Sequence, residues 1–219
     1  MIVLPHVRSL PVLALALVLG LAAPVSAQDT PPNAEPAPKA DSKDRRAALS
    51  SPLPNTPAER DTVLGDLYAR LAESEDELAA KSVADNIEGV WLHSGSPTVD
   101  LLFGRAMEAV SQKDFDRALR FLDHVVEQAP DFTEGWNRRA FVHFQLNNVG
   151  LALGDLRRTL ALDPNHFKAL DGLFQVLRDI GEKRAALEVL RRLADVHPYW
   201  SGAEQTIEEL SREVEGQGI

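Results

Sequence analysis

Three segments of the chain read ALRFLDHVVEQAP (residues 118–130), ALGDLRRTLALDP (152–164) and ALEVLRRLADVHP (186–198). Each begins with alanine, has leucine four residues later and ends in proline, and consecutive segments start 34 residues apart. Landmarks that recur at one period without an insertion indicate an internal repeat, and this period is typical of a helix–turn–helix unit that stacks on its neighbours. The stretch therefore predicts an all-α solenoid, and a binding scaffold is the first functional hypothesis.

The repeats predict three pairs of helices joined by short polar turns. The expected helices span 99–111 and 114–128, 133–146 and 149–162, and 167–180 and 183–196. Each repeat proline follows a second helix and stops it, because proline lacks the backbone N–H that another turn needs. A further helix, expected over 202–215, is predicted to cap the stack with one apolar face, made of Ala203, Ile207, Leu210 and Val214.

A helical hairpin is predicted ahead of the repeats, over residues 57–97. Residues 56–59 form a capping-box pattern with proline at the first helical position, and a second capping box opens another helix at Ser74. Ala84 falls in phase with the repeat alanines, but Glu88 stands where the later copies have leucine. The hairpin is therefore expected to pack like a degenerate repeat.

The first 27 residues have the pattern of a signal peptide. Their apolar run, residues 10–23, has about 14 residues, which suits a signal sequence and falls short of the roughly 20 that span a bilayer. We expect cleavage after Ala27 and export to the periplasm, with an uncleaved anchor as the alternative. Residues 28–56 are rich in proline and poor in large apolar side chains, so a disordered linker is expected there.

Composition and motifs argue against several functions. Acidic residues outnumber basic ones by 33 to 23, and the excess lies on the flanks of the repeats, which argues against a nucleic-acid partner. The chain has no cysteine, so disulfides and thiolate nucleophiles are excluded. The six histidines show no paired metal-ligand spacing, and no glycine-rich phosphate loop occurs. We expect no catalytic residue, no metal and no cofactor.

The repeats resemble those of the tetratricopeptide repeat (TPR) family. The second copy matches the signature positions best, with Trp136, Ala140, His143, Ala152, Leu156, Thr159 and Pro164. The third copy departs at Phe174, where the family has a small residue. The resemblance implies a right-handed α-solenoid with three repeats at 98–198 and a capping helix within 199–219. It puts Trp136 at a packing position, and we expect Arg139 to pair with Asp155.

In this family the first helix of each pair lines a concave groove, and the resemblance transfers that role to specific positions here. The candidate groove residues are Phe103, Met107, Val110, Asn137, Phe141, Phe144, Gln145, Asp171, Gln175 and Arg178. Lys168 shares such a position, but the Lys and Asn set with which some members bind a peptide C-terminus is absent, since Phe103 and Met107 replace it. The alternative is that the hairpin or the linker covers these residues.

These observations predict a non-catalytic adaptor of the bacterial periplasm that binds a peptide or helix of another protein. The size and signal resemble those of periplasmic TPR adaptors. Two alternatives remain open. One is a self-associating structural protein, with a homo-oligomer as its partner. The other is a chaperone that holds exported client proteins in the same groove.

Overall fold

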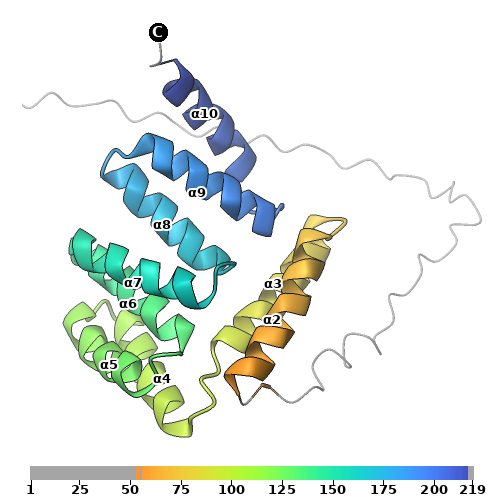
Figure 1. The fold of residues 1–219 in the computed structure, drawn as a ribbon. Coiled ribbons are helices and arrows are strands. Elements are labelled where there is room, and N and C mark those ends of the chain that lie inside the picture. Colours follow the sequence, from red (N-terminus) through yellow and green to blue (C-terminus); the bar gives the residue numbers. More distant parts are fainter. Residues whose placement is uncertain (1–52, 55, 217–219) are drawn as a thin grey trace, which may run out of the picture. The chain divides into compact units, whose positions relative to one another are not determined.

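The structure is a computed structural model, and it describes residues 53, 54 and 56–216. The expected signal peptide and nearly all of the expected linker lie outside these residues. Where it is described, the chain is helical and has no strand. Its helices are α2 (Pro57–Ala72), α3 (Glu77–Trp91), α4 (Pro97–Ser111), α5 (Phe115–Gln128), α6 (Thr133–Gln145), α7 (Val149–Leu162), α8 (Phe167–Asp179), α9 (Lys183–Val196) and α10 (Ala203–Glu215) (Figure 1).

Six helices form the three predicted repeats, as the pairs α4–α5, α6–α7 and α8–α9, which stack in chain order (Figure 1). The bounds of α7 and α9 are the predicted ones, and α6 and α8 each end one residue earlier than predicted. α4 begins two residues earlier than predicted, with Pro97 in its first turn. The all-α solenoid predicted from the 34-residue period is thus confirmed.

One turn joins the two helices of every repeat. Lys113, Asn147 and Gly181 occupy the same place in successive repeats and all adopt left-handed φ angles of 58°, 60° and 83°. The following amide closes the turn by donating to a carbonyl five residues earlier, as Asp114 does to Ala109 over 2.9 Å. Two of these three positions carry a side chain despite the left-handed backbone, at a cost of about 1 kcal/mol each.

Arginines on the second helices bind each repeat to the one before it. Arg158 donates to the carbonyl oxygen of Pro130 over 3.2 Å, and Arg192 makes the same bond to Pro164 over 2.6 Å. The repeat prolines therefore end one helix and also offer an acceptor to the next repeat.

The repeat alanines lie in the core. Ala118, Ala152 and Ala186 are fully buried, as is Ala140 on the first helix of the second repeat. Phe174, which takes the place of a small residue in the third repeat, is buried as well, so the α8–α9 pair accommodates the larger ring.

The hairpin α2–α3 starts as predicted but continues differently. Thr56 and Glu59 form the predicted capping box of α2. The second capping box is a wrong prediction, because Asp76 and not Ser74 caps α3, accepting from the amide of Ala79 over 2.7 Å. The Ser74 hydroxyl instead donates back to the carbonyl of Arg70 over 3.0 Å at the end of α2.

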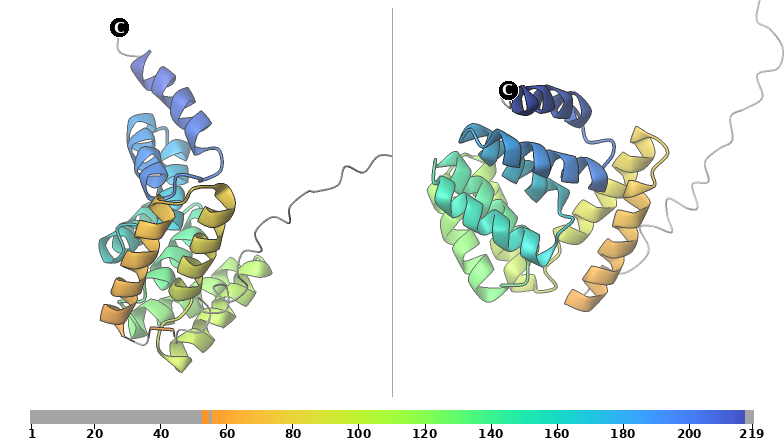
Figure 2. Two further views of the ribbon diagram at one scale, coloured as in Figure 1. Left: turned by 90° about the vertical axis from the view of Figure 1, so that its right-hand side faces the viewer. Right: turned by 45° about the horizontal axis from the view of Figure 1, so that its top comes forward.

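The hairpin packs against the third repeat and does not stack on the first. Leu71 of α2 and Ile87 of α3 are buried in one hydrophobic cluster with Leu170 of α8 and Leu190 of α9. Figure 2 shows α2 and α3 beside α8 and α9. The expectation that this hairpin packs like a degenerate repeat is therefore corrected.

Buried polar groups explain this position. The Tyr68 hydroxyl donates to Asp163 Oδ2 over 2.6 Å, and Trp91 Nε1 donates to the same oxygen over 3.1 Å. The Trp91 ring also stacks on the His166 imidazole, with centroids 3.7 Å apart. Burial and the Asp163 charge raise the pKa of Tyr68 far above its ordinary value, so its hydroxyl keeps its proton and donates it.

The first repeat cannot offer these partners. Asp163 and His166 belong to the loop between α7 and α8, and the equivalent loop residues between α5 and α6 are Ala129 and Phe132. Neither side chain accepts a hydrogen bond. The donors of the hairpin are therefore satisfied only one repeat further along the stack.

α10 packs on α9 and caps the stack as predicted. Ala203 and Leu210 are buried, and Ile207 and Val214 are partly buried against the same cluster. Among the described residues, no helix combines the length and the apolar character needed to cross a membrane.

Replacing Ala152 tests the repeat register. Ala152 is fully buried, so Ala152→Leu forces extra volume into a packed core and should lower the free energy of unfolding by about 1–3 kcal/mol. Ala161→Leu, at an exposed position of the same helix, is the matched control and should change it little. Urea unfolding of both variants measures this, and equal stabilities would contradict the register.

Candidate functional site

A cavity of about 470 Å³ lies between α6 and α8, and Trp200, in the loop after α9, also lines it. We call it the α6–α8 groove. Its lining residues are Asn137, Arg138, Ala140, Phe141, Phe144, Gln145, Leu156, Lys168, Asp171, Gly172, Gln175, Val176 and Trp200.

Six of the ten predicted groove residues meet in this cavity. α6 supplies Asn137, Phe141, Phe144 and Gln145, and α8 supplies Asp171 and Gln175. They lie together because equivalent positions on the first helices of stacked repeats face the same side. The structure thus brings these six residues together in one cavity of the second and third repeats.

The other four predicted residues lie elsewhere. Phe103 is 4% exposed and packs edge-to-face on Phe132, with centroids 5.2 Å apart. Met107 and Val110 are half-buried against the same cluster of the first repeat. Arg178 is exposed, and its guanidinium lies over the Phe174 ring. The apolar end of the groove that the sequence predicts in the first repeat is thus part of a core.

Trp200 is the groove residue that the sequence reasoning missed. It follows the last repeat proline and precedes α10, outside the helix positions that the repeat pattern assigns to a groove. No periodicity in the sequence links it to the predicted groove helices.

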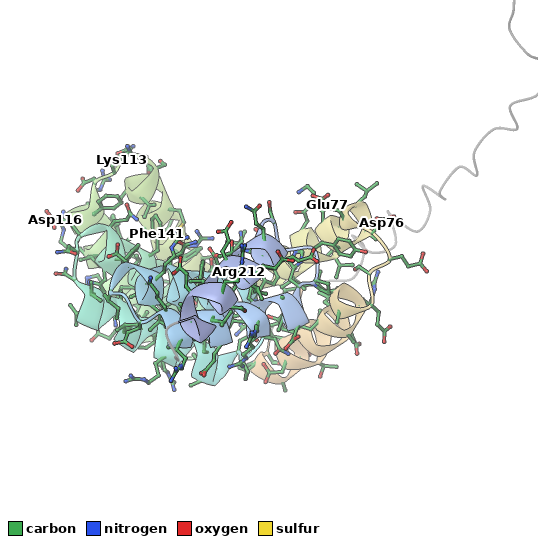
Figure 3. The ribbon with its side chains drawn as sticks, turned by 90° about the horizontal axis from the view of Figure 1, so that it is seen from above. Asp76, Glu77, Lys113, Asp116, Phe141 and Arg212 are labelled. Carbon is green, nitrogen blue, oxygen red and sulfur yellow. The ribbon has the colours of Figure 1, made fainter. Side chains whose placement is uncertain are left out.

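The floor of the groove is apolar, and the ring of Phe141 above it is exposed. Ala140, Leu156 and Val176 are buried in one cluster, on which Phe144 packs half-buried. Phe141 remains 43% exposed; Figure 3 labels its side chain. An exposed aromatic ring over an apolar floor is typical of a surface that binds an apolar side chain.

A buried polar cluster holds one rim of the groove. Glu134, which is 1% exposed, accepts from Asn137 Nδ2 over 2.9 Å and from Arg138 Nε over 2.5 Å. His166 Nδ1 accepts from the Ala169 amide over 3.2 Å, so its Nε2 carries the proton that it donates to Glu134 over 3.1 Å. These contacts fix the side chains of Asn137 and Arg138 where they line the cavity.

The same contacts set the ionisation of Glu134. Burial alone would raise the pKa of this carboxyl, but His166, Arg138 and Asn137 outweigh burial and hold the pKa at about 2, below the ordinary value of 4.5. Glu134 is therefore charged at neutral pH and acts as a structural acceptor.

Two adjacent arginines of α6, Arg138 and Arg139, have different roles. The predicted pairing of Arg139 with Asp155 is confirmed by two bonds of 2.8 Å, and a third bond of 2.9 Å reaches Asp123. The Arg139 guanidinium also lies 4.8 Å from the centre of the Trp136 ring. Arg139 and Trp136 thus hold helices together, whereas Arg138 faces the groove.

In the described part of the chain, no group of three or more histidine, aspartate or glutamate side chains is placed to hold a metal ion. His143, at a predicted packing position, is buried, and burial lowers its pKa below the ordinary value. The arrangement suits binding by shape, apolar contact and hydrogen bonds.

The buried cluster predicts a specific acid dependence. Because the pKa of Glu134 is lower in the folded state than in the unfolded chain, its contribution is present above about pH 4.5 and is lost as pH falls toward 2. Glu134→Gln should therefore be less stable than the natural protein at neutral pH, by on the order of 3 kcal/mol. Thermal unfolding of both proteins from pH 7 to pH 2 should show the gap closing below about pH 4.5. A gap that stays constant over this range would contradict the assignment.

Comparisons with known proteins agree with the fold. No protein-family profile matches the chain. A TPR repeat-containing protein of Rhizobium etli is 31% identical over 180 residues, an alignment that covers 76% of this chain and 88% of that protein.

Solved structures share the architecture. The crystal structure of the MamA protein has a TM-score of 0.50 at 19% identity and covers 73% of this chain and 84% of its own. The Sgt2 TPR domain of Aspergillus fumigatus has a TM-score of 0.51 at 18% identity, over 56% of this chain and 83% of its own. The first TPR of Spaghetti (RPAP3), bound to an HSP90 peptide, has a TM-score of 0.50 at 17% identity, over 53% of this chain and 92% of its own. With its 34-residue repeats, its stacked helix pairs and its Rhizobium relative, the chain belongs to the tetratricopeptide repeat family.

Proposed function

We propose that the protein is a non-catalytic adaptor that binds a peptide or helix of another protein in the α6–α8 groove. TPR domains generally mediate protein–protein interaction, and the RPAP3 domain of the same fold is bound to a peptide. The observation that carries the proposal is the 43% exposed ring of Phe141 above a buried apolar floor.

The lining suits a peptide in both its chemistry and its size. Phe141, Phe144 and Trp200 offer aromatic surface for an apolar side chain, and the exposed Gln145 offers an amide for a peptide backbone. A cavity of about 470 Å³ holds a few side chains, which is the scale of a short recognition segment.

The hairpin leaves the groove open. The sequence left open whether α2–α3 covers the candidate residues, but the hairpin docks on the third repeat and reaches the groove only at its rim, where Glu88 pairs with Lys168. Phe141 stays exposed. Among the described residues, therefore, the apolar lining lacks an internal partner that would cover it.

We propose a location in the bacterial periplasm; the pattern of the first 27 residues supports it, since a short apolar run precedes small residues that suit signal cleavage after Ala27. The partner is then another exported or envelope protein.

Self-association is the second candidate, and one observation favours it. Leu101 of α4 is 63% exposed, whereas Gly135 and Ala169, the equivalent positions of the later repeats, are buried where each repeat meets the one before it. An apolar residue at an open end of a repeat stack is a contact site for another copy. This candidate predicts a molecular mass that rises with concentration and falls in Leu101→Ser.

The groove is tested by removing its aromatic surface. Phe141→Ser with Phe144→Ser should abolish capture of one or a few partners in a crosslinked pull-down from the periplasmic fraction, because the apolar contact area is lost. Leu151→Ser, at a 58% exposed position of α7 outside the groove, is the matched control and should capture the same partners as the natural protein.

Capture of many unrelated, partly unfolded proteins would favour the chaperone alternative over the adaptor. Partners that survive the double change and disappear with the control would contradict the groove as the binding site.

A further inference from the structure

The two cations that line the α6–α8 groove are already neutralised. Arg138 pairs with the buried Glu134, and Lys168 pairs with Glu88 of α3 over 2.5 Å. Both acids lie outside the lining of the cavity. The groove therefore presents little free positive charge to a partner.

Asp171 is the acid of the lining, and it has no such partner. In the described part of the chain no lysine or arginine forms an ion pair with it; Gln175 Nε2 donates a long bond of 3.5 Å, and the Trp200 side chain is a second hydrogen-bonding neighbour. Arg178 is turned toward other groups, since it donates to Gln175 over 2.8 Å and lies over the Phe174 ring.

Burial makes this carboxylate costly to keep charged. Asp171 is half-buried, and burial raises its pKa above the ordinary value, against smaller opposing effects of Gln175, Trp200 and Arg178. A cation brought by a ligand would repay part of this desolvation, because a partly buried charge gains most from a direct partner.

The surroundings of Asp171 also suit a cation. Trp200 and the exposed Phe141 line the same cavity, and aromatic faces attract lysine and arginine heads while packing on their methylene stems. Trp200 also lines a smaller cavity of about 200 Å³, in which Lys81 pairs with Asp85 and no cation of the described residues forms an ion pair with Glu77. The charges left unneutralised around Trp200 are thus negative.

We propose that the α6–α8 groove selects a segment of a partner protein in which a lysine or arginine is flanked by apolar residues. The basic side chain pairs with Asp171 beside Trp200, and the apolar neighbours pack on Phe141 and Phe144. The inference rests on the proposed function and adds to it the chemistry of the partner.

The test measures binding of three fluorescein-labelled peptides to the full chain by fluorescence polarisation. The first has the sequence Gly-Ser-Phe-Leu-Lys-Phe-Leu-Ser-Gly, and the others carry Gln or Glu in place of Lys. We expect the Lys peptide to bind roughly tenfold more tightly than the Gln peptide, with the Glu peptide weakest. The preference should shrink at high salt.

Asp171→Asn should bring the Lys and Gln peptides to similar affinity, because the amide keeps the shape and removes the charge. Asp179→Asn, at an exposed position of α8 outside the cavity, is the matched control and should retain the preference. An unchanged melting temperature in both variants shows that they are folded.

Equal affinities of the three peptides, or a Lys preference that survives Asp171→Asn, would overturn the inference while Phe141-dependent binding still supports the proposed function. Failure of every peptide to bind would also overturn the inference. The crosslinked pull-down would then still test the proposed function independently. If Arg45→Ala with Arg46→Ala strengthens peptide binding, the part of the expected linker that carries Arg45 and Arg46 competes for the groove. If Asp171→Asn dissociates a dimer, a second copy of this chain occupies the groove. Either result would contradict the inference that the bound segment belongs to a separate partner protein.

Discussion

The carboxylate of Asp163 determines where the parts of this structure lie. It is buried, and it accepts from the Tyr68 hydroxyl, the Trp91 indole and the Asn165 amide. A buried carboxylate is tolerated only when such donors satisfy it, and the two side-chain donors come from a hairpin far away in the sequence. Asp163 therefore couples α2–α3 to the third repeat. With the hairpin on the third repeat, Leu101 of α4 and Phe141 in the α6–α8 groove are exposed among the described residues.

Sequence reasoning succeeded where the repeat period applies. Alanine, leucine and proline at a spacing of 34 predicted six helices to within two residues, because each copy reports the same packing. The left-handed turns were hidden, since one position holds glycine and the others hold Lys113 and Asn147. The place of the hairpin was hidden too, because Tyr68 and Asp163 are 95 residues apart and no periodicity links them.

The groove was predictable to the same extent. Asn137 and Phe141 were found because helical periodicity assigns them to the concave side. Phe103 holds the same repeat position as Asn137, yet it lies in the core of the first repeat, where packing on Phe132 takes precedence over the repeat pattern. Trp200 was missed because it lies past the last repeat proline. Residues shared by the copies hold the scaffold, and residues in which the copies differ, such as Asn137 and Asp171, give the groove its chemistry.

The central claim is that a partner protein contacts the α6–α8 groove, and site-specific photocrosslinking tests it most directly. The photoreactive residue p-benzoylphenylalanine is placed at position 141 in the groove or at position 151 on α7, and cells producing each variant are irradiated. The account predicts a discrete crosslinked product from position 141 and none from position 151. Equal crosslinking at both positions, or a product from position 151 alone, would contradict it.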